Sequence, residues 1–358
     1  MPEPISIQQI SIKSFKAFTS LQAGNFSRIN LITGKNNCGK SCLLEALFLC
    51  LGPANPELWV NITVKRSELN AFYPAMVDQL FNKFITNQDI CFEVNESSKQ
   101  PYKLKISKTT QIPYQISSIK QQEKGKVQTS KVIDVSNSIS LKFVYIPYKK
   151  PSKELITHAT ISPNEIIFTG QRQTIFVPSA ILWARGGRNP DVANYSSLDK
   201  ENRIPEFEKA LRIIEPDLKR TSIIIENNTA FVAGDTGYGL APLSIIGEGM
   251  NSFASILLTI GKGKDGVCLI DEIENGLHYS IFENFWSLID EYSQMSNCQI
   301  FATTHSYDCI KAANNVFKQN KSGDFSLHRL IKNQEETTLH FISQEQLESA
   351  LITDLDIR

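Results

Sequence analysis

The chain contains short, mainly apolar runs, separated by stretches in which apolar residues recur every three or four positions. The short runs cover residues 29–33, 267–270 and 299–303, and such runs are typical of strands that are buried on both faces. Residues 5–12 alternate imperfectly between apolar and polar side chains and predict an opening strand. Strands that alternate with helical stretches indicate an α/β fold, with a mixed or parallel sheet flanked by helices.

Helices are predicted where the apolar positions have helical spacing. Residues 281–292 have one apolar face and join the runs 267–270 and 299–303, which predicts a β-α-β crossover between parallel strands. Further helices are expected within 196–218 and at 251–260. A further helix is expected at residues 43–51. The apolar residues with helical spacing in these segments are Leu43, Leu44, Leu47, Phe48, Leu51, Ile204, Phe207, Leu211, Ile214, Ile281, Phe285, Leu288, Ile289 and Tyr292.

The character of the chain changes after residue 52. Residues 57–87 have helical spacing, whereas residues 90–146 are polar and rich in strand-forming segments. We expect an insertion at 53–169, helical at first and then β-rich, between the two parts of a core at 1–52 and 170–358. The strands expected in the insertion cover residues 90–94, 102–106, 131–135 and 140–146.

The insertion carries a local excess of positive charge, with eight lysines and two glutamates between residues 96 and 131. A basic surface of this kind could bind nucleic acid. Lysine is also common along exposed sheet edges, which it protects from pairing with other chains. Because aromatic residues for base stacking are few here, the sequence favours a solvated edge over a nucleic-acid surface.

The rest of the expected core contains one predicted buried strand and two predicted hairpins. Residues 174–179 predict a buried strand. Residues 222–226 and 229–233 predict a hairpin that turns at Asn227 and Asn228. A second hairpin, followed by a short helix, is expected from residues 325–331 and 337–342.

Composition excludes several classes of protein. The 358 residues carry a formal net charge of zero, so no whole-chain field attracts nucleic acid or membrane. The longest apolar runs are too short to span a bilayer, and the first residues lack the pattern of a signal peptide. Seven cysteines without a C-x-x-C pair indicate free thiols in a reducing cytoplasm, and five histidines show no metal-ligand spacing.

A phosphate-binding loop is predicted at residues 34–41, which fit the pattern G-x-x-x-x-G-K-[ST] between a strand and a helix. The two glycines allow a tight turn without side chains between the backbone and a phosphate. Lys40 is expected to contact the β- and γ-phosphates, and the Ser41 hydroxyl is expected to bind Mg²⁺. The predicted nucleotide-binding residues are Gly34, Lys35, Asn36, Asn37, Cys38, Gly39, Lys40, Ser41 and Cys42.

Two carboxylates follow the buried run 267–270. Asp271 is expected to hold Mg²⁺ and Glu272 to act as general base toward the attacking water. The next strand is followed by His305, which we expect close to the γ-phosphate. Parallel strands place these residues on one edge of the sheet, so the predicted catalytic residues are Glu272, His305 and Lys40.

Gly247, Glu248 and Gly249 precede another predicted helix and form a second candidate anion site. The chain has only one phosphate-binding loop, so this site could cap the γ-phosphate of a nucleotide bound to a second copy. A head-to-tail homodimer with two ATP molecules between the subunits would result. The alternative is an ordinary helix start.

These motifs resemble those of the ATP-binding-cassette ATPases, in the RecF/SMC/OLD-like branch. The resemblance covers residues 1–52 and about 170–358, and it is carried by 15–18, 34–41, 247–249, 269–278 and 303–306. It implies an ABC-type ATPase head that uses ATP and Mg²⁺. It also implies that residues 247–249 form the signature motif and that Asn275 and Gly276 belong to the D-loop.

The chain departs from parts of that family pattern. By resemblance, residues 175–179 lead into the Q-loop, but Ser179 stands where glutamine is usual, so no Q-loop Mg²⁺ ligand is assigned. No coiled-coil heptads occur, and the signature differs from the transporter form. OLD-family proteins carry a Toprim nuclease domain after the core, for which no segment is seen, so we expect any nuclease or effector to be a separate polypeptide.

Four functions are compatible with a phosphate-binding loop. The first is an ATPase that dimerises around ATP to control DNA processing or an effector, in phage defence or DNA repair. The second is a nucleotide-gated module that holds a toxin or nuclease with little turnover. A GTP switch would need N-K-x-D, and residues 82–85 fail at the last position. A metabolite kinase would not explain Asp271, Glu272, His305 and Gly247 together.

Overall fold

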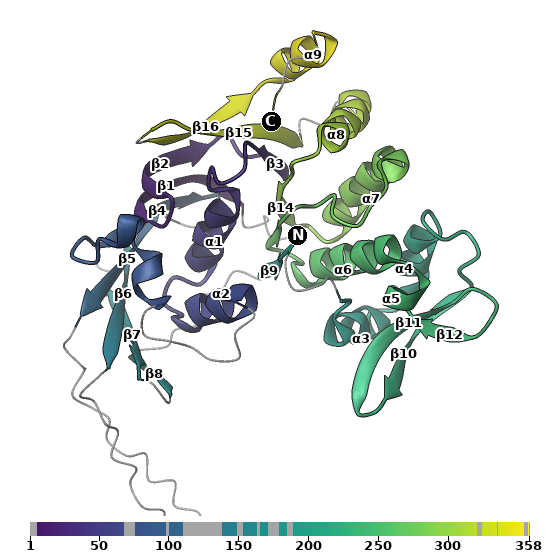
Figure 1. The fold of residues 1–358 in the computed structure, drawn as a ribbon, viewed down its shortest axis with the longest axis horizontal. Coiled ribbons are helices and arrows are strands. Elements are labelled where there is room, and N and C mark those ends of the chain that lie inside the picture. Colours follow the sequence, from purple (N-terminus) through teal and green to yellow (C-terminus); the bar gives the residue numbers. More distant parts are fainter. Residues whose placement is uncertain are drawn as a thin grey trace, which may run out of the picture.

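The computed structural model describes residues 6–67, 76–97, 100–109, 138–148, 153–162, 165–170, 179–184, 189–320, 324–334, 336–353 and 357. The strand expected at 131–135 and residues 174–178 lie outside the described residues. Two large sheets face each other with helix α1 (Lys40–Leu51) between them, and further helices cover the outer face of one sheet (Figure 1).

The six-stranded sheet has the order β16-β15-β3-β14-β13-β9. Neighbouring strands from β15 to β9 are all parallel, and only β16 runs antiparallel at the edge. This confirms the predicted α/β fold with a mixed, mainly parallel sheet. The strands are β3 (Ile29–Thr33), β9 (Ser179–Leu182), β13 (Val267–Ile270), β14 (Gln299–Thr303), β15 (Phe325–Lys332) and β16 (Thr337–Ile342).

Both faces of this sheet are buried, which explains why its strands are short apolar runs. In β13, Val267 and Leu269 point into the core that contains α1, whereas Cys268 and Ile270 point into the core on the opposite face. Alternate strand residues point to opposite faces, so one short run contributes to two cores.

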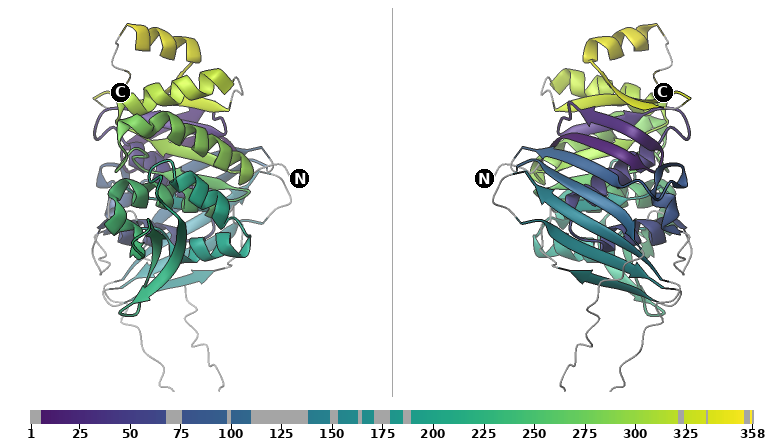
Figure 2. Two further views of the ribbon diagram at one scale, coloured as in Figure 1. Left: turned by 90° about the vertical axis from the view of Figure 1, so that its right-hand side faces the viewer. Right: turned by 90° about the vertical axis from the view of Figure 1, so that its left-hand side faces the viewer.

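Helices cover the face of the six-stranded sheet opposite α1 (Figures 1 and 2). They include the predicted crossover helix between β13 and β14, and a small three-stranded sheet follows α4. The helices are α3 (Val192–Lys200), α4 (Ile204–Leu211), α5 (Leu243–Ile246), α6 (Glu248–Lys262), η4 (Tyr279–Ile281), α7 (Phe282–Met295), α8 (Tyr307–Asn320) and α9 (Gln344–Ile352). None of the helices in the described part of the chain is long and apolar enough to cross a membrane.

Both predicted hairpins outside the insertion are confirmed. The first consists of β10 (Arg220–Glu226) and β11 (Thr229–Asp235), with β12 (Leu240–Pro242) paired beside β11. Asn227 and Asn228 have φ angles of 48° and 63°, the left-handed turn conformation that asparagine tolerates. The second is the pair β15 and β16, followed by α9.

The second large sheet has seven antiparallel strands in the order β2-β1-β4-β5-β6-β7-β8 (Figure 2). Its strands are β1 (Ile7–Phe15), β2 (Phe18–Gly24), β4 (Ile90–Glu96), β5 (Tyr102–Thr109), β6 (Ile139–Pro147), β7 (Leu155–Ile161) and β8 (Ile166–Gly170). The division into a core and an insertion stays a prediction. What the structure adds is that β4 pairs directly with β1, so the β-rich segment continues the sheet that the first two strands begin.

The helical prediction for residues 57–87 is wrong in its second half. Helix α2 covers Glu57–Ser67, but Asp78–Leu80 and Asn82–Phe84 form only short 3₁₀ turns, η2 and η3. Lys83 and Phe84 have φ angles of 51° and 61°, which an α-helix does not accommodate. Phe81 instead forms a bridge with Phe15 of β1, so tertiary pairing overrides the helical spacing.

The described lysines of β5 contact carboxylates. The side-chain nitrogen of Lys103 lies 3.2 Å from Glu93 on β4, and that of Lys105 lies 2.7 Å from Asp89. However, β5 lies between β4 and β6 rather than at an edge of the sheet, and most of residues 96–131 lie outside the described residues. Both interpretations of the basic segment therefore stay predictions.

Candidate nucleotide site

The carboxyl ends of β3, β13 and β14 meet at one edge of the six-stranded sheet. The loop from Gly34 to α1 follows β3, the acidic pair follows β13, and His305 follows β14. Open α/β sheets bind ligands at this edge. A cavity of about 620 Å³ lies there, lined by Gly34, Lys35, Asn36, Glu272, Glu274, Asn275 and His305.

The loop between β3 and α1 has a conformation that requires its glycines. Gly34 and Gly39 have φ angles of 145° and 109°. A Cβ atom at Gly34 would lie 2.4 Å from the Leu330 carbonyl oxygen, and one at Gly39 would lie 2.9 Å from the Phe18 ring. Gly39 is also the N-cap of α1 and has no side chain to bind the first amides of the helix. Those donors therefore point out of the helix end toward a potential anion.

Lys40 is buried at the start of α1. Its Nζ donates to the carbonyl oxygens of Gly34 at 2.7 Å and Lys35 at 3.1 Å, and it lies 3.4 Å from Nδ1 of His305. Burial lowers the pKa of Lys40, because desolvation disfavours the ammonium form. An anionic phosphate in the cavity would stabilise that charge.

Cys38 lies within the loop and Cys42 directly after it, and all seven cysteines are free thiols. The Cys38 thiol is buried and lies 2.8 Å from where a Cβ of Gly34 would sit. Burial raises the pKa of the Cys38 thiol, so it is neutral near pH 7. The side chain therefore packs beneath the loop, and only the backbone of this residue is suited to contact a phosphate.

Ser41 and Asp271 place a pair of oxygen-bearing side chains beside the loop. The Ser41 hydroxyl lies 3.1 and 3.0 Å from the two carboxylate oxygens of Asp271. Mg²⁺ prefers a small number of hard oxygen ligands together with phosphate and water. The two residues therefore fit the Mg²⁺ role predicted for them. Asp271 also accepts a hydrogen bond of 2.7 Å from the hydroxyl of Thr303.

The residues after Asp271 turn back toward the end of β14. Glu272 has a φ angle of 49°, and its N–H donates to the Thr303 hydroxyl at 2.8 Å. Glu274 accepts the N–H of His305 at 2.7 Å, and its other carboxylate oxygen is buried without a hydrogen-bond partner in the described part of the chain. The acidic turn and the histidine are thus tied together on one side of the cavity.

The turn between β1 and β2 supports α1 from the other side. Lys16, in a left-handed conformation with φ of 44°, places its Nζ 2.5 Å from the buried carboxylate of Glu45 in α1. The carbonyl of Lys16 accepts a hydrogen bond of 2.7 Å from Asn82. Phe18 packs against Gly39, so this turn contacts the helix and the loop at once.

The predicted signature residues start α6, which begins at Glu248 with Gly247 as its N-cap. They do not lie among the described residues that line the cavity at Gly34 and Glu272. A Cβ added to Gly247 would meet nothing within 4 Å, so its side faces open space.

The segments predicted as signature motif and D-loop contact each other within the chain. The Ser252 hydroxyl donates to the Asn275 carbonyl at 2.6 Å. A Cβ at Gly249 would lie 3.0 Å from the Gly276 carbonyl oxygen, and Gly276 itself has a φ angle of 81°. Gly249 and Gly276 therefore allow the two backbones to approach closely.

Two groups of the site, Glu274 and the Thr303 hydroxyl, are not predicted from the sequence. Glu274 had a weak signal, because it stands two residues after Glu272 in an Asp-Glu-x-Glu run. Thr303 ends a buried strand, and nothing in the sequence indicates that its hydroxyl contacts both acidic residues.

Comparisons with known proteins agree with a nucleotide site. The model of a family described as "AAA domain, putative AbiEii toxin, Type IV TA system" matches residues 29–308. A Helicobacter pylori protein named ATP/GTP phosphatase is 23% identical over 347 residues, covering 87% of this chain and 89% of that protein. A Methanocaldococcus jannaschii protein of uncharacterised function is 49% identical over 45 residues, which cover 13% of this chain and 20% of that protein.

The solved structures that this chain is similar to include heads of SMC proteins. An SMC head bound to the C-winged helix domain of ScpA has a TM-score of 0.49 and 14% identity, covering 95% of this chain and 99% of that one. The SMC head domain from Thermotoga maritima has a TM-score of 0.41 and 12% identity, with 94% and 99% coverage.

Proposed function

Because the chain belongs to the AAA-domain family whose model matches residues 29–308, we propose that it hydrolyses ATP to ADP and phosphate. Family membership supports the coarser part of the predicted resemblance, a P-loop ATPase, whereas the OLD-like branch stays a prediction. The single observation that carries the proposal is the convergence of Lys40, Ser41, Asp271 and Glu272 at the glycine loop. The name of the Helicobacter pylori relative, ATP/GTP phosphatase, supports hydrolysis of a nucleoside triphosphate.

Each residue has a role that follows from its position. The amides at the start of α1 and the Lys40 ammonium would bind the β- and γ-phosphates. Ser41 and Asp271 would hold Mg²⁺, which neutralises phosphate charge when bound. Glu272 lines the cavity and would accept a proton from the attacking water. His305, 3.4 Å from the Lys40 Nζ, would contact the γ-phosphate.

We propose that the complete site forms between two copies of the chain. The cavity is open, and residues 247–249 do not line it within one chain. Nothing among the described residues explains a glycine at Gly247, because a side chain there would meet no atom within 4 Å. A second copy that presents the start of α6 to the γ-phosphate would close the open cavity and would account for the glycine. Asn275 and Gly276 would then belong to the same contact between the two copies.

The partners expected from the sequence fit this proposal. A homodimer that closes around ATP could control a separately encoded nuclease or effector, or DNA, in the cytoplasm. The family description mentions a toxin and a Type IV toxin–antitoxin system, which favours a role in cellular defence over general DNA repair. The second candidate is a nucleotide-gated module with little turnover that holds such a partner.

Glu272→Gln tests hydrolysis and dimer formation together. We expect the unchanged protein to hydrolyse ATP with Mg²⁺ and the variant to lose at least about a hundredfold in rate, because a general base contributes about that much. The variant should bind ATP and elute as a dimer in size-exclusion chromatography with ATP and Mg²⁺, and as a smaller species without nucleotide.

A matched control is Glu345→Gln, at an exposed position on the first turn of α9, which should behave like the unchanged protein. If Glu272→Gln hydrolysed ATP as fast as the unchanged protein, Glu272 would not be the general base. ATP binding without measurable turnover in the unchanged protein would favour the gated module. A variant that binds ATP but stays monomeric would contradict the shared site.

A further inference from the structure

One buried hydroxyl contacts both acidic residues of the site. Thr303 is the last residue of β14 and is fully buried. Its Oγ1 lies 2.7 Å from Oδ1 of Asp271 and 2.8 Å from the backbone nitrogen of Glu272. The backbone carbonyl of Thr303 also accepts the N–H of Ile273 at 2.9 Å. A single side chain on one strand thus fixes the first residues after the neighbouring strand.

The donor and acceptor roles in this arrangement are determined. A backbone N–H only donates, so the Thr303 oxygen accepts from Glu272. The hydroxyl has one hydrogen, and it is therefore free to point at the Asp271 carboxylate. That hydrogen bond fixes the rotation of the carboxylate, whose oxygens also lie within 3.1 Å of the Ser41 hydroxyl.

The same contact holds Glu272 in an uncommon backbone conformation. Its φ angle of 49° belongs to the left-handed region, which non-glycine residues occupy only where the surroundings determine it. The hydrogen bond from the Glu272 N–H to Thr303 is one such constraint. Losing it would let the backbone relax and would move the carboxylate that lines the cavity.

We propose that Thr303 is a positioning residue that orients Asp271 toward the metal and Glu272 toward the attacking water. The inference rests on the proposed ATPase function. It predicts that removal of the hydroxyl weakens Mg²⁺ binding and slows hydrolysis together, while nucleotide binding through Lys40 and the glycine loop is retained.

Thr33 provides a matched control. It is also a fully buried threonine at the end of a strand of the same sheet, β3, but its hydroxyl has no hydrogen-bond partner among the described residues. Replacement of either threonine by valine exchanges the hydroxyl for a methyl group of similar size. Thr33→Val therefore reports the cost of a valine at a strand end without loss of a hydrogen bond.

The experiment compares Thr303→Val, Thr303→Ser and Thr33→Val. Mg²⁺ is titrated by calorimetry into each protein saturated with a non-hydrolysable ATP analogue, and ATP turnover is measured separately. We expect Thr303→Val to raise the Kd for Mg²⁺ and to lower kcat by about tenfold or more each, as loss of a partner of a metal ligand does. The KM for ATP should change by less than about threefold. Thr303→Ser and Thr33→Val should stay within about threefold of the unchanged chain on all three measures.

Unchanged Mg²⁺ affinity and kcat in folded Thr303→Val would overturn the inference, and so would equal losses in the serine and valine variants. If circular dichroism shows that Thr303→Val does not fold, Thr303→Ala replaces it. Serine and alanine both lack the methyl group and differ in the hydroxyl alone, so equal behaviour would also overturn the inference. If the unchanged protein fails to hydrolyse ATP, the proposed function falls, but the Mg²⁺ titration still tests Thr303.

Discussion

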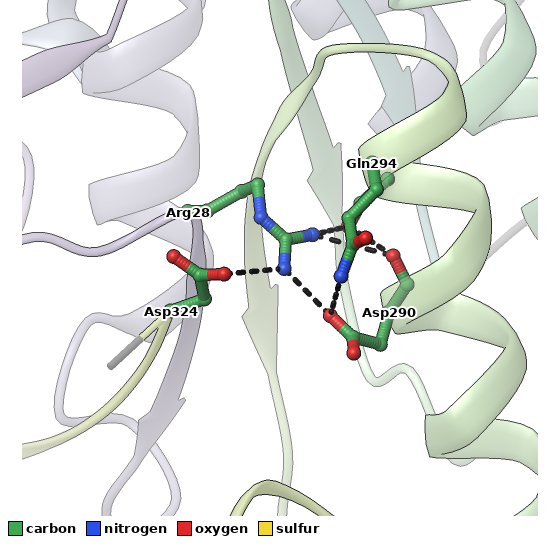
Figure 3. Close-up of polar contacts among 5 residues, drawn as sticks. Arg28, Asp290, Gln294 and Asp324 are labelled. Atoms are coloured by element: carbon green, nitrogen blue, oxygen red, sulfur yellow. Dashed lines mark hydrogen bonds and ion pairs between the residues drawn. The ribbon is translucent and has the colours of Figure 1, made fainter. Parts of the chain in front are cut away.

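The two ends of the six-stranded sheet hold buried positive charge in different ways. At the amino end, Arg28 precedes β3 and contacts Asp290 of α7 at 2.6 Å and Asp324, before β15, at 3.0 Å (Figure 3). It also donates to the Ser293 hydroxyl and the Asp290 carbonyl. At the carboxyl end, the Lys40 ammonium is held by two carbonyl oxygens and lies beside the imidazole of His305.

This difference suits Arg28 to a structural role and Lys40 to the proposed binding of an anion. Two carboxylates neutralise the charge of Arg28, and the contacts link three segments that are far apart in the sequence. Carbonyl oxygens orient Lys40, and although burial lowers its pKa, the nearby Asp271, Glu272 and Glu274 carboxylates offset only part of that shift. The protein therefore carries the cost of burying Lys40 until an anion binds, whereas the interactions of Arg28 are complete without a ligand.

The largest expected effect is on nucleotide binding in Lys40→Met. We expect the affinity for ATP, measured with a fluorescent analogue, to fall at least about a hundredfold, because charge-assisted contacts with two phosphates are lost. The free energy of unfolding should stay the same or rise, since a poorly neutralised buried amine is removed. Lys209→Met, at an exposed position on α4 that does not line the cavity, should bind ATP like the unchanged protein. Unchanged ATP affinity in Lys40→Met would show that this loop does not bind the nucleotide.

Arg28→Met should show the opposite behaviour. We expect the free energy of unfolding in urea to fall by about 3 kcal/mol, because two carboxylates lose their partner and the Arg28 side chain is only 19% exposed. ATP affinity of the folded protein should not change. Arg220→Met is the control, because Arg220 is 61% exposed and lies 3.8 Å from Asp235, so it should cost less than about 1 kcal/mol. A loss of ATP affinity at unchanged stability would contradict the structural role.

The amino half of the six-stranded sheet should also contribute less to the stability of the fold at acid pH. Burial lowers the pKa of His328 in β15 to about 4, and its Nε2 lies 2.9 Å from the Ser326 hydroxyl. The unfolded chain takes up this proton near pH 6.5, so the unfolded state binds more protons between pH 6.5 and 4. The free energy of unfolding should therefore decrease as the pH falls from 6.5 to 4, by up to roughly 3 kcal/mol. His328→Gln should remove this part of the pH dependence when the free energy of unfolding in urea is measured at each pH. If the two proteins gave parallel curves of unfolding free energy against pH, His328 would not be the cause.

The sequence predicted the carboxyl end far better than the amino end. Gly34 to Ser41, Asp271, Glu272 and His305 follow strands that could be recognised as short apolar runs, and a parallel sheet places their ends together. The approximate positions of the site residues therefore follow from local patterns and one rule of topology.

Contacts that depend on side-chain direction could not be predicted in this way. Arg28 and Asp290 are 262 positions apart, and no local pattern relates them. The contact between Thr303 and Glu272 requires both the pairing of β13 with β14 and a left-handed backbone at Glu272. Periodicity likewise predicted helix at residues 78–87, where pairing between Phe15 and Phe81 determines the conformation instead.

The smallest expected effect distinguishes charge from hydrogen bonding at the carboxyl end. Glu274→Gln keeps an oxygen that can accept the His305 N–H, now 2.7 Å away, and removes a negative charge from the cavity wall. We expect ATP turnover to change less than about tenfold and stability by less than about 1 kcal/mol, because the hydrogen bond survives. Glu274→Ala removes the acceptor as well and should lower turnover further. If the glutamine variant lost as much as the alanine variant, the charge itself would be needed, and Glu274 would act directly on the nucleotide or the metal. The carboxyl end would then contain a third functional carboxylate, which would sharpen its contrast with the neutralised pair around Arg28.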